Sequence, residues 1–511
     1  MNIKKLASLL FQRSVIVALL IFLQAAMLLL YMLWFSSDFI YVYWGCVVLS
    51  ILAVLIIVSR QTDPGYKIAW IIPILLFPAF GWLLCGGNKL SARKRRKMQG
   101  MDRTMLEQLE RDYKAEELRP FGADAVNQAR YLEHYARCPV YTNTYTHYFP
   151  LGDDVFPAML EELRKAEKYI FLEYFIISPG IFWDSMVEIL KEKHAAGVDV
   201  RVIYDDVGSL NTLPMNYARK FETETGIPCC CFNRFKPVIS IRMNNRDHRK
   251  FCIIDGHTAF TGGINLADEY INQKLRYGHW KDTAILLKGE AVWSMTVMFL
   301  TMWEYTRDVE EDYRRFRPDK LPPEAAQGAG YYVQPYADNP LDEEAVGEAV
   351  YLNLINKAER YVYAMTPYLI ISDSVNTALC NAAKSGVDVR IITPHIPDKA
   401  LVFELTRSHY ESLLEAGVQI FEYTPGFVHA KVMVTDDCCG VVGSINLDYR
   451  SMFLHFEDGV WLCEAPCIRD IRKDFEDTLS VCQRISLRQW RHLNPLLQLY
   501  RNILRIFAPL M

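Results

Sequence analysis

The sequence lacks a paired cysteine framework and an excess of charge of one sign. Its thirteen cysteines occur singly or in runs such as 229–231, and no Cys-x-x-Cys pair is present. We therefore expect buried thiols in a reducing compartment, without a disulfide scaffold and without a zinc site. The formal net charge is only −4, so no global basic field indicates a nucleic-acid partner.

Long apolar runs are present, and they are concentrated at the N-terminus. Residues 15–35 form a 21-residue run whose clearly polar member is Gln24, and residues 39–58 form a second run of 20 residues. Each is long enough to cross a bilayer core of about 30 Å as a helix. A cleaved signal peptide is the alternative for the first run, but that run is longer than a signal core and a second run follows at once. We expect two transmembrane spans.

Charges near these runs predict their orientation. Basic residues lie outside the pair of runs, at Lys4, Lys5, Arg13, Arg60 and Lys67, whereas the connection between the runs carries only Asp38. The positive-inside rule then places both ends of the pair, and the rest of the chain that follows, on the cytoplasmic side of the cell membrane.

A third apolar run, residues 68–85, is shorter and contains two prolines. A full span here would put the basic cluster that follows on the outer side, so a re-entrant or interfacial segment is expected. The cluster is Lys89, Arg93, Lys94, Arg95, Arg96 and Lys97. It would lie against the anionic inner leaflet, with a solvated linker helix as the alternative.

Beyond residue 120 the chain repeats itself. Three segments recur in the same order, at offsets of 192, 189 and 181 residues: 166–177 with 358–371, 195–205 with 384–394, and 248–265 with 429–446. In each copy short β-branched runs alternate with helical patterns, which predicts an α/β fold with a largely buried sheet.

These patterns divide the chain into four parts. We expect a membrane anchor at 1–90, a basic and charged linker at 91–120, a first α/β/α half at 121–317 and a second half at 334–511. The residues between the halves are rich in proline and glycine, as linkers are. The tail from Arg484 alternates arginine with large apolar residues; it is expected either to lie on the membrane surface or to pack on the second half.

Each half carries the pattern His-x-Lys-x4-Asp-x6-Gly-x-x-Asn. Its members are His248, Lys250, Asp255, Gly262 and Asn265 in the first half, and His429, Lys431, Asp436, Gly443 and Asn446 in the second. The probability of such a five-residue match is of order 10⁻⁷ per start position, and here it occurs twice at equivalent places of a repeat. The two motifs are therefore expected to be functional, and to meet about a pseudo-twofold axis in one site.

The residue types suit a phosphodiester. The segment that holds His and Lys is expected to be a strand, on which residues two apart face the same side. Two ammonium groups and nearby amides would hold the non-bridging oxygens, while the imidazoles would supply a nucleophile and a proton donor. Gly263, Ser444 and the two asparagines are candidate substrate-binding positions. Asp255 and Asp436 stay among the catalytic candidates, although their place at the turn that closes the strand favours a structural role.

Each imidazole also requires a carboxylate that orients it. The candidates are Asp282 and Glu457, which lie 34 and 28 residues after the histidine of their own half. Glu269 and Asp458 are weaker competitors, and a solvated surface role is the alternative for both candidates.

The two motifs resemble the phospholipase D superfamily, and the wider sequence is closer still to bacterial cardiolipin synthases. Segments that carry this resemblance are HRKFCIIDGHTAFTGGINLADEY, HWKDTAILLKG, YDDVGS, GSINLDYRS and the N-terminal hydrophobic pair. It covers essentially the whole chain. One departure is Gly263, which stands where the second half has Ser444, so the first half lacks one hydroxyl donor.

The resemblance implies that two phosphatidylglycerol molecules are converted to cardiolipin and glycerol, with no metal and no cofactor. It assigns His248 as the nucleophile and His429 as the acid, and it implies orienting carboxylates, which we map to Asp282 and Glu457. A basic stretch with Arg234, Lys236, Arg242 and Arg246 would receive the second anionic lipid, or form a solvated loop.

Two other functions remain as alternatives. One is a membrane-bound phosphodiesterase or nuclease that uses water or another alcohol at the same site, and the other is a silent membrane-binding scaffold. The sequence leaves open the acceptor, the acyl chains and the oligomeric state.

Overall fold

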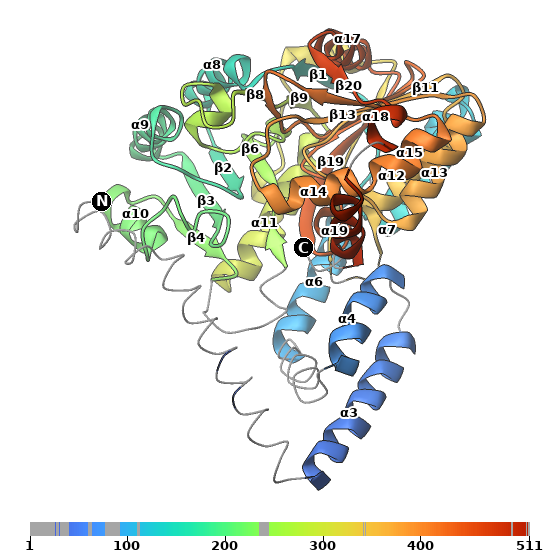
Figure 1. The fold of residues 1–511 in the computed structure, drawn as a ribbon. Coiled ribbons are helices and arrows are strands. Elements are labelled where there is room, and N and C mark those ends of the chain that lie inside the picture. The colour runs from blue at the N-terminus through green and yellow to red at the C-terminus, as the bar shows by residue number, and fades with distance from the viewer. Residues whose placement is uncertain are drawn as a thin grey trace, which may run out of the picture.

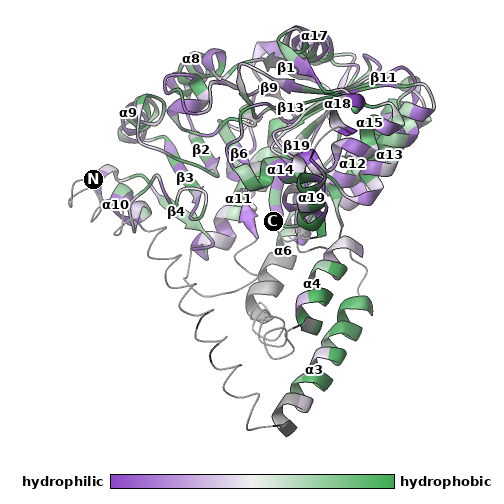
Figure 2. Cartoon of the chain, viewed as in Figure 1, coloured by the Kyte–Doolittle hydropathy of each residue, from purple (hydrophilic) through white to green (hydrophobic). Residues whose placement is uncertain are grey.

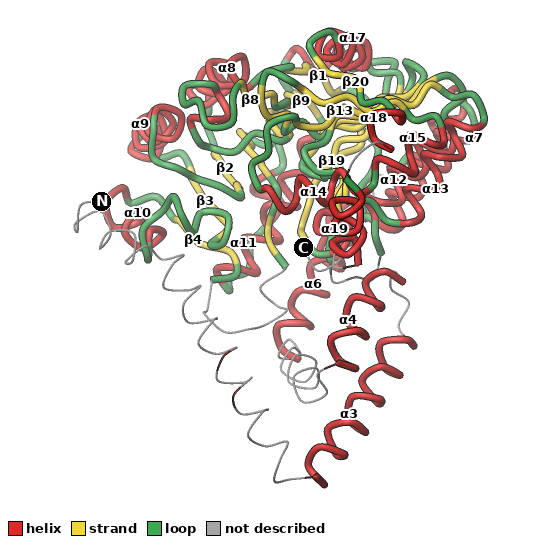
Figure 3. The backbone as a smooth tube through the Cα atoms, in the orientation of Figure 1, coloured by secondary structure: helices red, strands yellow, loops and turns green. Residues whose placement is uncertain are grey.

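The computed structural model of the protein describes residues 40–59, 64–76, 92–109, 113–234, 245–340, 344–491 and 494–506, together with the single residues 26, 30, 342 and 508 (Figure 1). A large α/β body contains both motifs. Figure 3 shows its strands gathered in the middle of the body with helices around them.

The first half is built on a seven-stranded mixed sheet. Its order is β1-β9-β7-β6-β2-β3-β4, with β2-β3-β4 parallel and the other neighbours antiparallel. The strands are β1 (Thr144–Phe149), β2 (Tyr169–Tyr174), β3 (Asp199–Asp205), β4 (Cys229–Phe232), β6 (Lys250–Ile254), β7 (Thr258–Gly262) and β9 (Ala284–Gly289). The helices are α7 (Ala123–Tyr135), α8 (Gly152–Lys165), α9 (Ile181–Ala195), α10 (Tyr217–Thr225) and α11 (Val292–Arg307), with short 3-10 turns η2 (Ala115–Phe121), η4 (Asp268–Ile271), η5 (Tyr313–Phe316) and η6 (Pro323–Gly328).

The second half repeats this order as β10-β19-β17-β16-β11-β13-β14, to which β20 is added at the edge. The strands are β10 (Tyr332–Asp338), β11 (Tyr361–Met365), β13 (Asp388–Pro394), β14 (Gln419–Tyr423), β16 (Val432–Thr435), β17 (Cys439–Gly443), β19 (His455–Cys463) and β20 (Cys482–Arg484). The helices are α12 (Val346–Lys357), α13 (Asp373–Lys384), α14 (Ala400–Ser408), α15 (Tyr410–Ala416), α16 (Tyr449–Phe453), α17 (Cys467–Leu479), α18 (Leu487–Arg491) and α19 (Pro495–Ile506). The repeat predicted from sequence is thus a repeat of sheet topology.

Two short exchanged pairings join the halves. Strand β5 (Arg246–Asp247), which precedes the first motif, pairs with β19 of the second half. Strand β15 (Gly426–Val428), which precedes the second motif, pairs with β8 (His279–Lys281) of the first half. A further small pair, β12 (Leu369–Ile370) with β18 (Leu447–Asp448), lies within the second half. The reciprocal exchange places the two motifs against each other.

The hydrophobic core also crosses the boundary between the halves. Helix α11 is buried along most of its length, and one cluster of apolar side chains combines residues of both sheets. Helix α7, which belongs by sequence to the first half, bonds to the second: Asn353 Nδ2 donates to Gln128 Oε1 over 2.7 Å, and Tyr131 Oη donates to Glu344 over 2.7 Å. The two halves are therefore one packed body.

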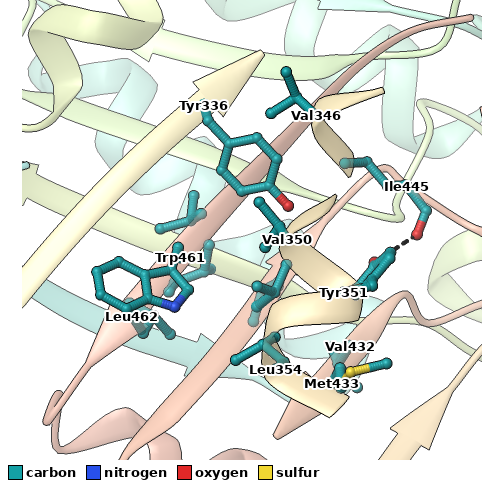
Figure 4. Packing of buried hydrophobic residues seen from close by; sticks show 14 of the residues in the cluster. Tyr336, Val346, Val350, Tyr351, Leu354, Val432, Met433, Ile445, Trp461 and Leu462 are labelled. Atoms are coloured by element: carbon teal, nitrogen blue, oxygen red, sulfur yellow. Dashed lines mark hydrogen bonds between the residues drawn. The ribbon is translucent and has the colours of Figure 1, made fainter. Parts of the chain in front are cut away.

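The second motif rests on a well-defined part of this core (Figure 4). Val350 and Leu354 of α12 pack over Val432 and Met433 of β16, close to Trp461 of β19. The Tyr351 hydroxyl donates a hydrogen bond to the Ile445 carbonyl over 2.8 Å. This contact fixes the backbone between Ser444 and Asn446, so packing outside the site determines where the motif residues stand.

The N-terminal predictions are tested only in part. Helix α3 (Ile40–Ser59) covers the second apolar run and α4 (Pro64–Leu76) begins the third, and Figure 2 shows both rich in apolar residues. Among the described helices, none combines the length and apolarity that crossing a bilayer requires. The first run lies almost wholly outside the described residues. The basic cluster lies where Lys89 and the side chains of α6 (Ala92–Leu109) up to residue 99 are not described.

Candidate active site

The two motif histidines stand just before the strands, in the segments that cross between the halves. His248 follows β5 and its N–H donates to the Phe456 carbonyl over 2.9 Å; His429 follows β15 and its N–H donates to the Lys281 carbonyl over 2.6 Å. Each accepting carbonyl belongs to the residue immediately before a predicted carboxylate. The backbone exchange therefore brings each histidine to the carboxylate of the opposite half.

The side chains make the same exchange. His248 Nδ1 lies 2.9 Å from Glu457 Oε2, and His429 Nδ1 lies 2.6 Å from Asp282 Oδ2. Both carboxylates are fully buried. Their spacing in sequence pairs each with the histidine of its own half, and the structure shows that this pairing is crossed. A carboxylate at Nδ1 fixes the tautomer in which Nε2 carries the lone pair.

The motif lysines turn back on the same segments. Lys250 Nζ donates to the His248 carbonyl, and Lys431 Nζ donates to the His429 carbonyl and lies 2.7 Å from His429 Nδ1. Burial lowers the pKa of Lys250 to about 8 and that of Lys431 to about 7. Both lysines therefore change their charge near neutral pH.

The imidazoles respond to the charges of both halves. Burial, followed by the nearby ammonium groups of Lys250 and Lys431, holds the pKa of His248 well below its usual value. Burial and then Lys431 lower the pKa of His429 to about 4, and Lys250 of the other half acts in the same direction. The free site therefore contains neutral imidazoles in a positive environment, which is suited to an arriving anion.

The Gly263 departure has a structural reason. A Cβ at Gly263 would lie 2.0 Å from Asp282 Oδ1, so the carboxylate already occupies that space. In the second half Ser444 Oγ occupies it instead, accepting from the Asp458 N–H over 2.9 Å and donating to Glu457 Oε2 over 2.5 Å. Glycine with aspartate and serine with glutamate are therefore matched pairs, and Ser444 holds the carboxylate.

The two asparagines also hold neighbouring groups. Asn265 accepts from the Ile176 N–H over 3.0 Å and donates to the Tyr270 hydroxyl over 2.8 Å. Asn446 is 4% exposed and its Oδ1 has no hydrogen-bond partner among the described residues. The asparagine of the first half is thus fully engaged, whereas that of the second retains an open acceptor.

Asp255 and Asp436 lie at the far ends of β6 and β16, with positive φ angles of 52° and 56°. The Asp255 carboxylate accepts from the N–H groups of Glu167, Lys168 and Tyr169. Asp436 accepts from the equivalent three N–H groups, those of residues 359–361. These contacts favour the structural alternative over the catalytic role, because the carboxylates tie down the loop before a strand.

The weaker carboxylate candidates are engaged elsewhere. Glu269 pairs with Arg276 over 2.9 Å, and Asp458 accepts from the Thr261 hydroxyl. Arg246 belongs to the basic stretch that was predicted to receive the second lipid. It is 1% exposed and pairs with Asp205 over 2.9 Å, so this prediction is wrong for Arg246. Lys236 and Arg242 lie outside the described residues.

Aromatic residues that the motifs do not include surround the imidazoles. Phe175 lies against His248 with ring centroids 4.9 Å apart, and Trp280 and Tyr270 each lie 5.4 Å from His429. A further imidazole, His455, lies 5.5 Å from His248. The strand period offers a signal for His455, because it precedes Glu457 by two residues and so shares its face.

Among the described residues, one group offers three potential metal ligands: single atoms of His248, His455 and Glu457, all within 4.8 Å of one another. Lys250 and Lys431 lower the pKa of His248 through their charge. The same two ammonium groups would repel a divalent cation. The arrangement is therefore better suited to an anionic phosphodiester than to a metal ion.

Comparison with known proteins identifies the same two halves. The family model described as cardiolipin synthase, PLD-like domain matches residues 159–303 and 351–479, and a phospholipase D-nuclease N-terminal model matches residues 48–84. A cardiolipin synthase of Geobacillus thermodenitrificans is 33% identical and aligns with 92% of this chain and 95% of its own length. An uncharacterized protein of Streptococcus mutans serotype c is 43% identical, over 90% of this chain and 99% of that protein.

A solved structure shares the fold. The phosphatidylserine synthase of Haemophilus influenzae matches with a TM-score of 0.57 and 14% identity, over 75% of this chain and 98% of that one. At this identity the likeness concerns the fold alone.

Proposed function

Because the chain belongs to the family of PLD-like cardiolipin synthases, and is thus a phosphatidyltransferase, we propose that it joins two phosphatidylglycerol molecules into cardiolipin and releases glycerol. The observation that carries the proposal is the crossed pair of imidazoles, each oriented by a buried carboxylate of the opposite half. One site thereby contains two equivalent groups, as a double displacement at phosphorus requires.

In the first step His248 Nε2 attacks the phosphorus of one phosphatidylglycerol. The bond from phosphorus to the glycerol headgroup oxygen breaks, and the electron pair of that bond leaves with the oxygen. His429 donates a proton to it, so that glycerol departs and a phosphatidyl-histidine remains. The approaching phosphate raises the pKa of His429, because its negative charge favours the imidazolium. His429 Nε2 therefore takes up a proton from water as the substrate binds, and this is the proton that it donates.

In the second step the now neutral His429 accepts the proton from the terminal hydroxyl of a second phosphatidylglycerol. That oxygen attacks the phosphorus and the bond to His248 breaks, which gives cardiolipin and the free enzyme. Lys250 and Lys431 hold the non-bridging oxygens in both steps, since their charge matches the anion. Asp282 and Glu457 keep the two tautomers in place.

Product analysis tests the reaction. The full chain in phosphatidylglycerol membranes should release glycerol and cardiolipin in equal amounts, as measured by mass spectrometry. His248→Ala should lose the activity, and His429→Ala should lose it as well. Phosphatidic acid as the main product would establish hydrolysis in place of transfer, and retained transfer by His248→Ala would exclude the histidine intermediate. Mixtures with phosphatidylethanolamine would identify other acceptors.

We further propose that residues 1–90 attach the enzyme to the cell membrane, with the body on the cytoplasmic side. Helix α3 exposes large apolar side chains, for example Trp44 at 59%, Leu55 at 60% and Ile56 at 57%. The C-terminal helix α19 packs one face on α14 and α4. Its opposite face exposes an apolar row: Leu496, Leu499, Tyr500, Ile503 and Ile506. Burying such a face in a bilayer surface is favourable.

Paired substitutions test the α19 contact. Leu499→Asp with Ile503→Asp should lower activity on phosphatidylglycerol in bilayers by roughly tenfold, because two apolar side chains leave the interface. Activity on the same lipid in detergent micelles should change little. Gln498→Asp, on the more covered side of α19, is the matched control. Equal losses in bilayers and micelles would exclude a membrane role for this face.

A further inference from the structure

His455 is a buried histidine whose polar atoms are not accounted for by the fold. It is 7% exposed, and within the part of the chain that the structure describes neither of its ring nitrogens has a hydrogen-bond partner. Buried polar groups are normally paired, so an orphaned imidazole beside a reaction centre requires an explanation. Burial lowers the pKa of His455 to about 3, so its ring is neutral and can donate through one nitrogen only.

Glu457 is the neighbour that lacks a donor. Its Oε2 atom interacts with His248 and with the Ser444 hydroxyl, whereas its Oε1 atom is buried and has no hydrogen-bond partner among the residues that the structure describes. The Nδ1 atom of His455 lies 3.5 Å from that Oε1 atom. This separation is longer than an ordinary hydrogen bond, and a movement of a few tenths of an ångström would close it. This one bond would satisfy His455 Nδ1 and Glu457 Oε1, and it would leave His455 Nε2 as the unpaired atom of the ring among the described residues.

The local backbone makes this movement small. His455 and Glu457 are two residues apart on β19, which is buried throughout, so their side chains leave the same face of the strand. The next segment on that side is β5, whose register pairs Arg246 with His455. His248 follows directly, and its ring lies 5.5 Å from that of His455. The side chains of His248, His455 and Glu457 thus lie side by side in one layer.

The first half has no such imidazole. The position equivalent to His455 is Trp280, because each precedes its carboxylate by two residues and each following carbonyl accepts from the motif histidine of the other half. Trp280 lies against His429. The Asp282 oxygen that does not contact His429, Oδ1, accepts from the Thr283 N–H over 2.8 Å. In the second half the equivalent N–H, that of Asp458, is taken by Ser444. Glu457 therefore needs a donor from elsewhere.

We propose that His455 is a positioning residue for His248: its ring donates to Glu457 Oε1 and fixes the carboxylate that orients the nucleophile. The inference rests on the proposed function, in which His248 attacks phosphorus. A fixed carboxylate keeps Nδ1 of His248 protonated and Nε2 free. The hydrogen bond also spreads the charge of Glu457, so His248 is held as a neutral imidazole at lower pH than it would be beside an unpartnered carboxylate.

The test compares three full-length variants by rate and pH profile. His455→Phe keeps a ring of similar size but no donor, and its kcat should fall roughly tenfold or more, as for other residues that orient a reacting imidazole. KM for phosphatidylglycerol should stay unchanged. The acidic limb of kcat/KM should move to higher pH, because an unpartnered carboxylate stabilises the imidazolium of His248. His455→Asn, whose amide can donate to Oε1, should restore much of the rate and the position of the limb.

His409→Phe is the matched control. His409 is 2% exposed and lies at the junction of α14 and α15, and its two ring nitrogens likewise have no partner among the described residues. The His409→Phe variant should affect folding about as much as His455→Phe does. It should leave kcat and the acidic limb of kcat/KM of the folded enzyme unchanged. Equal behaviour of His455→Phe and wild type would overturn the proposal, as would equal losses in the Phe and Asn variants with no movement of the limb.

Two further outcomes separate this inference from its alternatives. Zinc retained by the purified wild type, and lost together with activity on chelation, would make His455 a metal ligand and overturn the positioning role. The rates in this test count cardiolipin and phosphatidic acid together. A wild type that only hydrolyses would therefore contradict the proposed function, and its rate would still report the effect of changing His455. Full transfer by His248→Ala would remove the nucleophile on which both proposals depend.

Discussion

At the scale of single residues, the site is defined by two lysines whose pKa values lie close to neutral pH. Lys250 and Lys431 are buried, and burial lowers the pKa of each, to about 8 and about 7. A lysine whose pKa is lowered is charged below that pKa and loses its charge as the pH rises through it. The electrostatic attraction between the two lysines and the phosphate is therefore strongest in mildly acidic solution, and it weakens in alkaline solution.

This argument predicts a pH-dependent affinity. KM for phosphatidylglycerol should rise several-fold between pH 7 and pH 9, as the two ammonium groups of the free enzyme deprotonate. The alkaline fall of kcat should occur at higher pH, because the bound phosphate stabilises the ammonium form. Lys431→Arg should lower the overall rate but flatten the rise in KM, since arginine stays charged. Steady-state kinetics across this range measure all three, with Lys288→Arg, a lysine paired with Glu162, as control. A flat KM in the wild type would contradict the prediction.

The matched pairs at the carboxylates give a second prediction. Gly263→Ser should lower activity by roughly 10- to 100-fold, because the new Cβ would meet Asp282 Oδ1 at 2.0 Å and displace the group that orients His429. The double variant Gly263→Ser with Asp282→Glu copies the arrangement of Ser444 and Glu457 and should recover part of the loss. Rates of cardiolipin formation for both variants provide the measurement. A double variant that is no better than the single one would show that the two arrangements are not interchangeable.

At the scale of elements, the structure separates the third motif residue from the chemistry. Asp255→Asn leaves a residue that tolerates the positive φ, but it replaces one carboxylate oxygen that accepts backbone N–H groups with an amide that donates. The variant should lose about 1–3 kcal/mol of stability and keep kcat per folded molecule. Thermal unfolding and active-site-normalised rates measure the two effects. Asp436→Asn is the equivalent change in the second half; a lower kcat at unchanged stability would return both residues to a catalytic role.

The elements also show what a sequence can predict. The α/β class of each half and the meeting of the motifs follow from a repeat whose strands are short apolar runs, such as β2 and β11. These signals are local. The crossing of Glu457 to His248 is not local: it depends on β5 pairing with β19, segments about 200 residues apart. Alternation along one strand gives no information about which strand lies beside it, so spacing within each half suggested the wrong partner. His455 does carry a local signal, because it lies two residues before Glu457 on the same strand, but its place beside His248 depends on the same pairing of β5 with β19.

At the scale of the whole molecule, the exchange makes each half incomplete. Neither histidine has its carboxylate without the other half, and a buried lysine–aspartate ion pair also joins the halves. Lys281 Nζ of the first half lies 2.7 Å from Asp474 of α17, and the Tyr148 hydroxyl donates to the same carboxylate over 2.7 Å. Lys281 is 3% exposed, so its ammonium group has little access to water as a substitute partner.

We therefore expect the two halves to unfold as one unit. Asp474→Asn should lower the free energy of unfolding by about 3–5 kcal/mol, because it leaves a buried ammonium group without its counter-charge. The melting temperature should fall in a single transition, followed equally by circular dichroism and by loss of activity. Glu476→Gln on the same helix breaks a largely exposed pair with Arg472, and exposed pairs contribute about 0–1 kcal/mol, so it should have little effect. Two separated transitions in Asp474→Asn would mean that the halves are stable independently, and that the crossed site is assembled after folding and not during it.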